Sequence, residues 1–482
     1  EYSGMAFALC GTIQGNMGNQ AAAARLGEIS QQIYDTTNGR SVACWTLLTV
    51  TNHIEGYACD VASGMQKYHR GYRLGMEEGD FEAAFISWQS GITLAFMSGY
   101  RLPSIIASVA SMLETAKLFS IEFTVVTMTI TLKFFRRVAG ELPMDWKEVE
   151  DCEKACKTLT SETSAQELFT WLYKMSVNSI LCIYSKRYES AHRIMTKFLR
   201  LSDHDKSYLT FQHNLYHYGL SCAGMSRISQ TKSARKKYKT KLQGVIKELK
   251  RTAHQRGMNG YHRCMLLEAE LASLSRKSTV ADVERSYEVT ISVAAAARHI
   301  NDASFASELA GDQFVRMDQR DLARTYYAQA WVLYEEWGAS SRTRCLEESR
   351  GEYLDDESIA YAKETLERRK INVRAMGGGL GVMNTTAIDD DVPLMEGTDQ
   401  STLVDVSSNR SKNMNMMSNT TAGAEIATKM MSNSFTTPRT SKGKTSLNGS
   451  SKKSPSRHRF PGTNGGDDDD DGNISVLSDG SL

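Results

Sequence analysis

The chain has 482 residues, and its 57 Lys and Arg residues nearly balance its 56 Asp and Glu residues, so the formal net charge is +1. This balance argues against a protein that binds nucleic acid or a membrane over its whole surface, but it leaves room for a local basic patch. Only six residues are proline, and just Pro103 and Pro143 precede Val392. Because proline breaks helices, this scarcity favours an all-α fold and disfavours a β-sandwich.

Apolar residues recur at helical spacing from residue 19 onward, and the joints between the predicted helices are short and polar or contain glycine. Short joints place successive helices antiparallel to one another. The longest apolar run, 119–135, contains Glu122 and several Thr and Ser residues, which predicts a buried helix and no transmembrane segment. The predicted helices span about 19–36, 41–54, 57–77, 80–97, 103–117, 119–138, 145–159, 164–184, 188–201, 207–224, 232–256, 260–275, 280–299, 302–316 and 320–336.

The clearest internal repeat is 304–337, which has the 34-residue length of a tetratricopeptide (TPR) repeat. Two helices cross closely only where side chains are small, and large rings fill the space beside the crossing. The small positions are Gly311, Ala323 and Ala330, and the large ones are Phe314 and Tyr327. Less regular copies at 65–98, 172–205 and 264–297 predict a TPR-like antiparallel helix-hairpin solenoid over 1–374. An irregular helical bundle is the alternative, since Tyr72 and Leu271 stand where small residues are expected.

Composition changes near Arg374, after which Gly, Ser, Asn, Thr, Met and Lys follow in low-complexity order. Such a segment has too few large apolar residues to offset the entropy of ordering it, so we expect a disordered tail over 375–482. Thr437 and Ser454 each precede a proline and are candidate phosphorylation sites. Chance pairs in a solvated tail are the alternative.

A Gly-Lys-Thr triplet and a histidine pair resemble parts of chemical sites, but neither is predicted to be one. Lys444 belongs to a Gly-Lys-Thr triplet, but the upstream glycine of a phosphate-binding loop is replaced by Pro438. His213 and His217 would share a helix face, yet two ligands and the distant Cys222 do not make a zinc set, which favours surface or groove histidines. The sequence therefore predicts no catalytic, cofactor-binding or metal-ligating residue.

The cysteines number nine, an odd count, and they show no disulfide spacing. This pattern favours reduced thiols in a cytoplasmic protein. Cys152 and Cys156 share a helix face, and we expect them to be a reduced pair.

A groove is expected along the first helices of the repeats, where a segment of a partner protein would bind. The candidate residues mix aromatic, aliphatic and charged types and lack the basic cluster that would hold a C-terminal carboxylate. They are Tyr173, Ser176, Ile180, Ile183 and Tyr184 in 172–205, and Phe305, Glu308, Asp312, Val315 and Arg316 in 304–337.

The segment 232–256 is strongly basic, with apolar residues at helical spacing on one side. Such a helix contacts an acidic partner, RNA or an anionic membrane surface, or it is an ordinary solvated helix face. Tyr238 is its only large aromatic residue, too few for a base-stacking platform. The basic patch is Lys232, Arg235, Lys236, Lys237 and Lys239.

Two blocks of sequence resemble a known family. They are GYRLGMEEGDFEAAFISWQSGITLAFMSGYRL at 71–102 and a longer block from LLEAELASLSRK to EEWGASSRTRCLEE that ends at Glu348 and includes the Trp337-Gly338 pair. They resemble the TPR-like region of large signalling ATPases that fuse a serine/threonine-kinase-like domain, an AAA-type ATPase, this helical region and a GAF plus histidine-kinase output. The resemblance covers about 40–350.

The resemblance implies an ATPase or kinase domain upstream in the same polypeptide, and the chain, which starts at Glu1, is expected to be part of a larger protein. No catalytic residue is carried over, and the low-complexity tail where the output domain would follow puts histidine-kinase activity in doubt. We therefore predict a non-catalytic interaction or regulatory solenoid. One alternative is the regulatory part of an ATP-dependent signalling enzyme, and another is a scaffold that binds RNA or an acidic partner through 232–256.

Overall fold

The computed structural model describes residues 2–37, 40–55, 61–160, 163–202, 208–256 and 260–375, and those residues form helices and turns with no strand. This confirms the all-α prediction for the described part of the chain. Ala375 ends the last described helix, so the predicted tail, with Thr437 and Ser454, otherwise lies outside the described residues. The α-helices are α1 (Ser3–Asn16), α2 (Gln20–Thr37), α3 (Ala43–Thr49), α4 (Val61–Glu78), α5 (Phe81–Met97), α6 (Leu102–Leu118), α7 (Glu122–Ala139), α8 (Trp146–Thr158), α9 (Ala165–Tyr184), α10 (Tyr188–Leu201), α11 (Leu209–Ile228), α12 (Lys232–Arg256), α13 (Tyr261–Ser273), α14 (Val280–Ala296), α15 (Ile300–Arg316), α16 (Arg320–Trp337), α17 (Ser340–Arg350) and α18 (Asp356–Ala375). Two short 3-10 helices, η1 (Arg40–Val42) and η3 (Gly351–Tyr353), and a π-helix, η2 (Val50–Glu55), lie between them.

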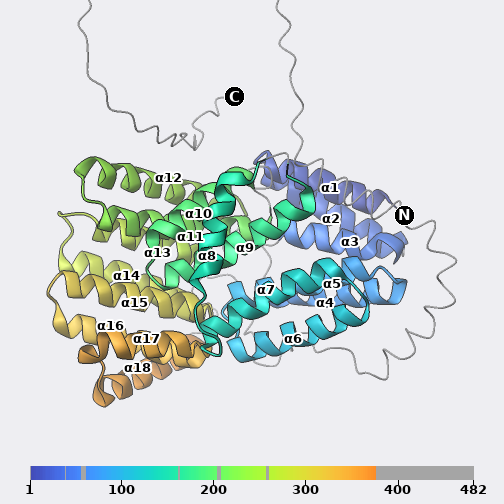
Figure 1. Ribbon diagram of the computed structural model, residues 1–482. Coiled ribbons are helices and arrows are strands. Elements are labelled where there is room, and N and C mark those ends of the chain that lie inside the picture. Colours follow the sequence, from blue (N-terminus) through green and yellow to red (C-terminus); the bar gives the residue numbers. More distant parts are fainter. Residues whose placement is uncertain are drawn as a thin grey trace, which may run out of the picture. The chain divides into compact units, whose positions relative to one another are not determined.

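Consecutive helices pack as hairpins, among them α1 with α2, α4 with α5, α11 with α12 and α15 with α16, as the solenoid prediction requires (Figure 1). The spacing of the hairpins differs from that of a TPR repeat, however. α14, α15 and α16 begin at Val280, Ile300 and Arg320, so a hairpin takes about 40 residues where a TPR unit takes about 34. The expected unit 304–337 thus starts one turn inside α15.

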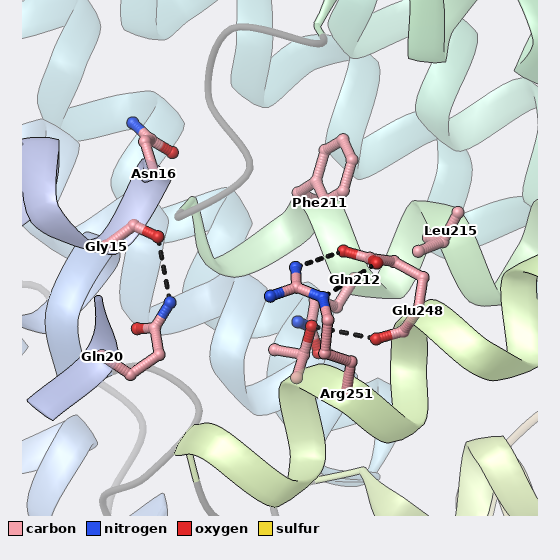
Figure 2. A pocket seen from close by; sticks show the side chains of 9 residues that line it. Gly15, Asn16, Gln20, Phe211, Gln212, Leu215, Glu248 and Arg251 are labelled. Atoms are coloured by element: carbon pink, nitrogen blue, oxygen red, sulfur yellow. Dashed lines mark hydrogen bonds and ion pairs between the residues drawn. The ribbon is translucent and has the colours of Figure 1, made fainter. Parts of the chain in front are cut away.

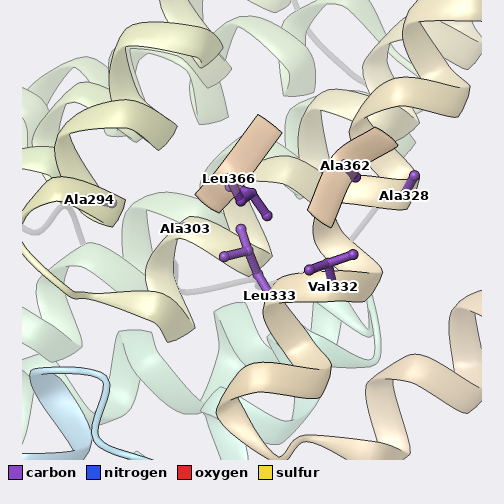
Figure 3. Packing of buried hydrophobic residues seen from close by; sticks show 7 residues of the cluster. All are labelled: Ala294, Ala303, Ala328, Val332, Leu333, Ala362 and Leu366. Carbon is purple, nitrogen blue, oxygen red and sulfur yellow. The ribbon is translucent and has the colours of Figure 1, made fainter. Parts of the chain in front are cut away.

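α15 is enclosed by the helices around it, since every residue from Asn301 to Phe314 is buried. Gly311 permits this packing, because a Cβ atom there would lie 2.7 Å from the Tyr327 ring of α16. A cluster of small and aliphatic side chains from α14, α15, α16 and α18 closes the core on the C-terminal side (Figure 3). It consists of Ala294, Ala303, Ala328, Val332, Leu333, Ala362 and Leu366.

The turn between α5 and α6 contacts helices two hundred residues later in the sequence. The Phe96 carbonyl accepts a hydrogen bond from Asn301 Nδ2 at 2.9 Å, and the Tyr100 carbonyl accepts one from Trp337 Nε1 at 3.0 Å. Gly99 has φ +77°, and a Cβ there would lie 2.6 Å from the Ile300 nitrogen. A simple solenoid repeat contacts only its neighbours, so these contacts add a long-range closure to the stacked hairpins.

Replacing Gly311 by alanine should lower the free energy of unfolding by about 1–3 kcal/mol, because the added methyl group overpacks the contact with Tyr327. Gly351→Ala is the matched control, since nothing lies within 4 Å of a Cβ at that position. Urea unfolding followed by circular dichroism measures both. Equal stability of the two variants would contradict close packing of α15 on α16.

Candidate functional site

The acidic side chains of α15 are buried and bound within the chain. Glu308 is 1 % exposed, and both of its carboxylate oxygens accept hydrogen bonds from Arg342 Nη2 at 2.7 Å. Tyr334 donates its hydroxyl to Glu308 at 2.7 Å, and Lys186 Nζ lies 2.9 Å away. Burial by itself raises the pKa of Glu308, but the Arg342 and Lys186 charges and the hydrogen bonds outweigh it and lower the pKa to about 2.

Asp312 lies one turn further along α15 and extends the same network. Its carboxylate accepts a hydrogen bond from the Tyr327 hydroxyl at 2.7 Å and contacts Arg350 Nη2 at 3.2 Å. Lys186 also donates to Asp312. The network therefore joins the α9–α10 turn, α15, α16 and α17 around two buried carboxylates. Removing a partner of either carboxylate leaves a buried charge unpaired.

The expected groove is filled at most of its predicted positions. Besides the two acids, the side chains of Phe305 and Tyr184 are 2 % and 5 % exposed, and their rings contact each other with centroids 5.2 Å apart. Ile180 and Ile183 are also buried. The reason is that helices distant in sequence pack onto the side of α9 and α15 that the repeat pattern left open. These six positions belong to the interior and form no open groove surface.

The four remaining groove candidates lie nearer the surface. Tyr173 and Ser176 are half-buried and hydrogen-bonded, to Thr131 Oγ1 at 2.7 Å and to Asn214 Oδ1 at 2.8 Å. Val315 is half-buried, and Arg316 is exposed. The structure does not bring these four into one cleft with the buried set.

A second buried cluster surrounds Asp302 at the start of α15. Asp302 Oδ2 lies 2.7 Å from His262 Nε2 and accepts a hydrogen bond from Arg263 Nε at 2.8 Å. His299 donates Nδ1–H to the Met97 carbonyl at 3.0 Å, and Arg263 donates to the same carbonyl. The cluster thus ties α13 and α15 to the α5–α6 turn.

His262, His299 and Asp302 lie close enough to be tested as a metal site, since their ligand atoms lie within 4.8 Å of one another. The donor set does not fit a cation, because the Arg263 guanidinium already neutralises the carboxylate that would bind it. A positive charge 2.8 Å from the ligand oxygen opposes a second one. We interpret the cluster as an ion-pair and hydrogen-bond network.

The predicted histidine pair is buried and does not lie on the surface. His213 and His217 are 6 % and 3 % exposed, and His217 Nδ1 lies 2.8 Å from the His213 carbonyl oxygen. Cys222 contacts His192 and neither of these histidines. Cys152 and Cys156 are free thiols, as predicted, and burial raises their pKa values to about 12 and about 11.

The basic patch on α12 is accessible. Lys232, Arg235, Lys236 and Lys237 are exposed and Lys239 is half-buried. The exposed face also includes Lys247 and Lys250, which the predicted patch omitted. Lys232, Lys236, Lys247 and Lys250 share one side of the helix, at spacings of four, eleven and three residues.

The negative charge near this face is small. Glu248 is the only acidic residue of α12, and it pairs with Arg251 at 2.6 Å. Lys250 pairs with Glu268 of α13. The row from Lys232 to Lys247 is therefore a basic surface about 23 Å long.

A shallow pocket lies between the α1–α2 hairpin and the α11–α12 hairpin (Figure 2). Its polar groups are bound to one another, since Gln20 Nε2 donates to the Gly15 carbonyl at 2.9 Å and Arg251 donates to Glu248. It is lined by Gly15, Asn16, Gln20, Phe211, Gln212, Leu215, Glu248, Arg251 and Thr252.

Comparisons with protein-family models, with curated proteins and with solved structures find no match to this chain. Among the described residues, none of the helices has the length and apolar character needed to cross a membrane.

Replacing Glu308 by alanine should lower the free energy of unfolding by about 3–5 kcal/mol, because Arg342 is then buried without its partner. The matched control is Glu364→Ala, which removes an exposed ion pair with Arg368 and should cost less than about 1 kcal/mol. Urea unfolding at pH 7 measures both. If Glu308→Ala lowers the free energy of unfolding no more than Glu364→Ala does, the buried network does not stabilise the fold.

Acidification should destabilise the protein between pH 6.5 and 4. Burial lowers the pKa of His217 to about 4 in the folded protein, whereas the unfolded chain binds its proton near pH 6.5. The unfolded state therefore binds more protons in this window, and one such histidine costs about 2 kcal/mol at pH 5.

Urea unfolding at pH 7.5 and pH 5 measures this loss, and His217→Asn, which does not titrate, should reduce it. Part of the stability loss should remain in this variant, because burial also lowers the pKa values of His262 and His299. A wild-type free energy of unfolding that is the same at pH 7.5 and pH 5 would contradict the lowered pKa of His217.

Proposed function

We propose that this chain is a non-catalytic helical-repeat scaffold that binds an acidic segment of a partner protein along the exposed basic face of α12. The observation that carries the proposal is the row Lys232, Lys236 and Lys247 on the outer side of a helix whose inner side is buried. Figure 1 places α12 at one edge of the stack of helices from α10 to α18. The row thus lies on a helix whose other side packs on α11 and α13.

The chemistry of the row favours an acidic protein segment over single-stranded RNA. Lysine ammonium groups are hydrated point charges that attract any polyanion. RNA-binding platforms add aromatic rings on which bases stack. Tyr238, the only Phe, Tyr or Trp residue of α12, is half-buried and packs on the His192 ring with centroids 5.0 Å apart, so α12 lacks the several open rings that base stacking uses.

The resemblance to signalling ATPases extends this proposal. In that setting the scaffold is the regulatory region of an enzyme whose ATPase or kinase domain lies upstream in the same polypeptide, and partner binding at α12 regulates that domain. A longer reading frame that encodes a Walker-type loop or a kinase lobe before Glu1 supports this extension. A longer frame without either contradicts it and leaves the scaffold proposal untouched.

Charge reversal at two positions of the row, Lys236→Glu with Lys247→Glu, should weaken binding of a fluorescent oligoglutamate peptide at least tenfold. Each substitution replaces an attraction by a repulsion, and the tenfold loss expected for the two together corresponds to about 1.4 kcal/mol. Fluorescence anisotropy over a range of NaCl concentrations measures the affinity. The control is Lys117→Glu with Lys277→Glu, which makes the same net charge change at exposed lysines of other segments.

Equal weakening by the two double variants would mean that only net charge matters and would reject the site. An RNA oligomer of equal charge is titrated in parallel. If RNA binds tighter than the peptide and loses affinity in the α12 variant alone, the partner class proposed here is wrong.

A further inference from the structure

The chain carries an acidic segment of its own directly after α18. Residues 376–409, which lie outside the described residues and are called the acidic segment below, contain six Asp and Glu residues and no Lys or Arg, a net charge of −6. α12 has the opposite balance, with ten Lys and Arg residues against the single Glu248, a net charge of +9. The acidic residues of the segment are Asp389, Asp390, Asp391, Glu396, Asp399 and Asp405.

The basic row of α12 has no acidic partner among the described residues. Lys232, Lys236 and Lys247 are exposed and form no ion pair there, whereas Lys250 pairs with Glu268. Lys232 and Lys236 lie one turn apart, where like charges on a helix repel each other. Several carboxylates laid along the row relieve this repulsion, so the row favours a multivalent anion over a single one.

The acidic segment is long enough to reach the row. From α18 to α12 the successive packed neighbours are α16, α15, α14 and α13, and five steps of 8–10 Å place the two helix axes at most about 50 Å apart. Asp389 and Asp405 lie 14 and 30 residues beyond Ala375, which corresponds to about 48 and 102 Å of extended chain. The carboxylates of the segment therefore span the distance to α12.

A second acidic run, Asp467–Asp471, is less suited to the row. It follows six basic residues between Lys442 and Arg459, so residues 442–471 together have a net charge of +1. Those basic residues compete with α12 for the run and are themselves repelled by α12. The segment without any basic residue is therefore the better match.

We propose that the acidic segment of the same chain occupies the basic row of α12 and competes there with the acidic partner. This inference rests on the proposed function, because it assigns the regulation of that binding face. A segment of the same polypeptide meets α12 at a local concentration of about 1 mM. Even weak charge pairing then fills the row when the partner is at micromolar concentration, and the partner must displace the segment to bind.

Neutralising the acidic segment in the full chain should lower the Kd of the fluorescent oligoglutamate peptide about tenfold, which corresponds to a segment affinity of about 100 μM at a local concentration of about 1 mM. Fluorescence anisotropy at one low NaCl concentration measures the Kd. The substitutions are Asp389→Asn, Asp390→Asn, Asp391→Asn, Glu396→Gln, Asp399→Asn and Asp405→Asn.

Two controls separate contact with α12 from a change of net charge. Asp→Asn at all five positions of 467–471 makes nearly the same charge change and should alter the Kd less than twofold. Neutralising the acidic segment in the Lys236→Glu, Lys247→Glu variant should also alter the Kd less than twofold, because the row no longer holds the segment.

Three results would overturn the proposal. One is an equal Kd for the wild type and the neutralised variant while the peptide binds through the row. Another is an equal tightening in either control, since net charge alone would then explain it. The third is a difference that grows with protein concentration, which would mean that the segment comes from a second copy. A peptide that binds neither chain would instead reject the proposed function, and this inference with it.

Discussion

The burial of three acidic side chains on one helix, α15, is the constraint on which the rest of the structure depends. Asp302, Glu308 and Asp312 lie at 6 %, 1 % and 4 % exposure, and a buried carboxylate is tolerated only with opposite charges and hydrogen-bond donors around it. Those donors come from α13, from the α9–α10 turn, from α16 and from α17. The positions of these segments relative to α15 are therefore set by charge pairing as well as by apolar packing.

This constraint also explains why the interior is not a binding groove. In an open helical repeat, the first helices present one side to a ligand. Here that side of α15 contacts side chains of the same chain, and the turn at Met97 closes over its N-terminal end. The surface that we propose for a partner, among the described residues, is therefore an outer one, the basic face of α12.

The sequence was sufficient for the helices and most of their joints, because a 3.6-residue apolar period and turn residues are local signals. The predicted helices did not include α1, whose three buried glycines weaken the helical pattern, or α17 and α18, and the predicted hairpin was too short. The groove prediction was wrong at its buried positions for a different reason. Glu308 and Phe305 look like groove residues of a repeat, and only the three-dimensional packing shows that Arg342 of α17 and Tyr184 of α9 cover them. The patch on α12 was predictable, since a row of lysines opposite apolar residues is itself a local signal.

Hydrogen exchange followed by mass spectrometry in the variant Arg342→Met tests the central claim most directly. If the buried network couples α15 to the rest, losing the partner of Glu308 speeds exchange both in α15 and in the α5–α6 turn at Phe96 to Tyr100, which has no direct contact with residue 342 among the described hydrogen bonds. Faster exchange in α16 and α17 alone, with α15 and the turn unchanged, would contradict the account.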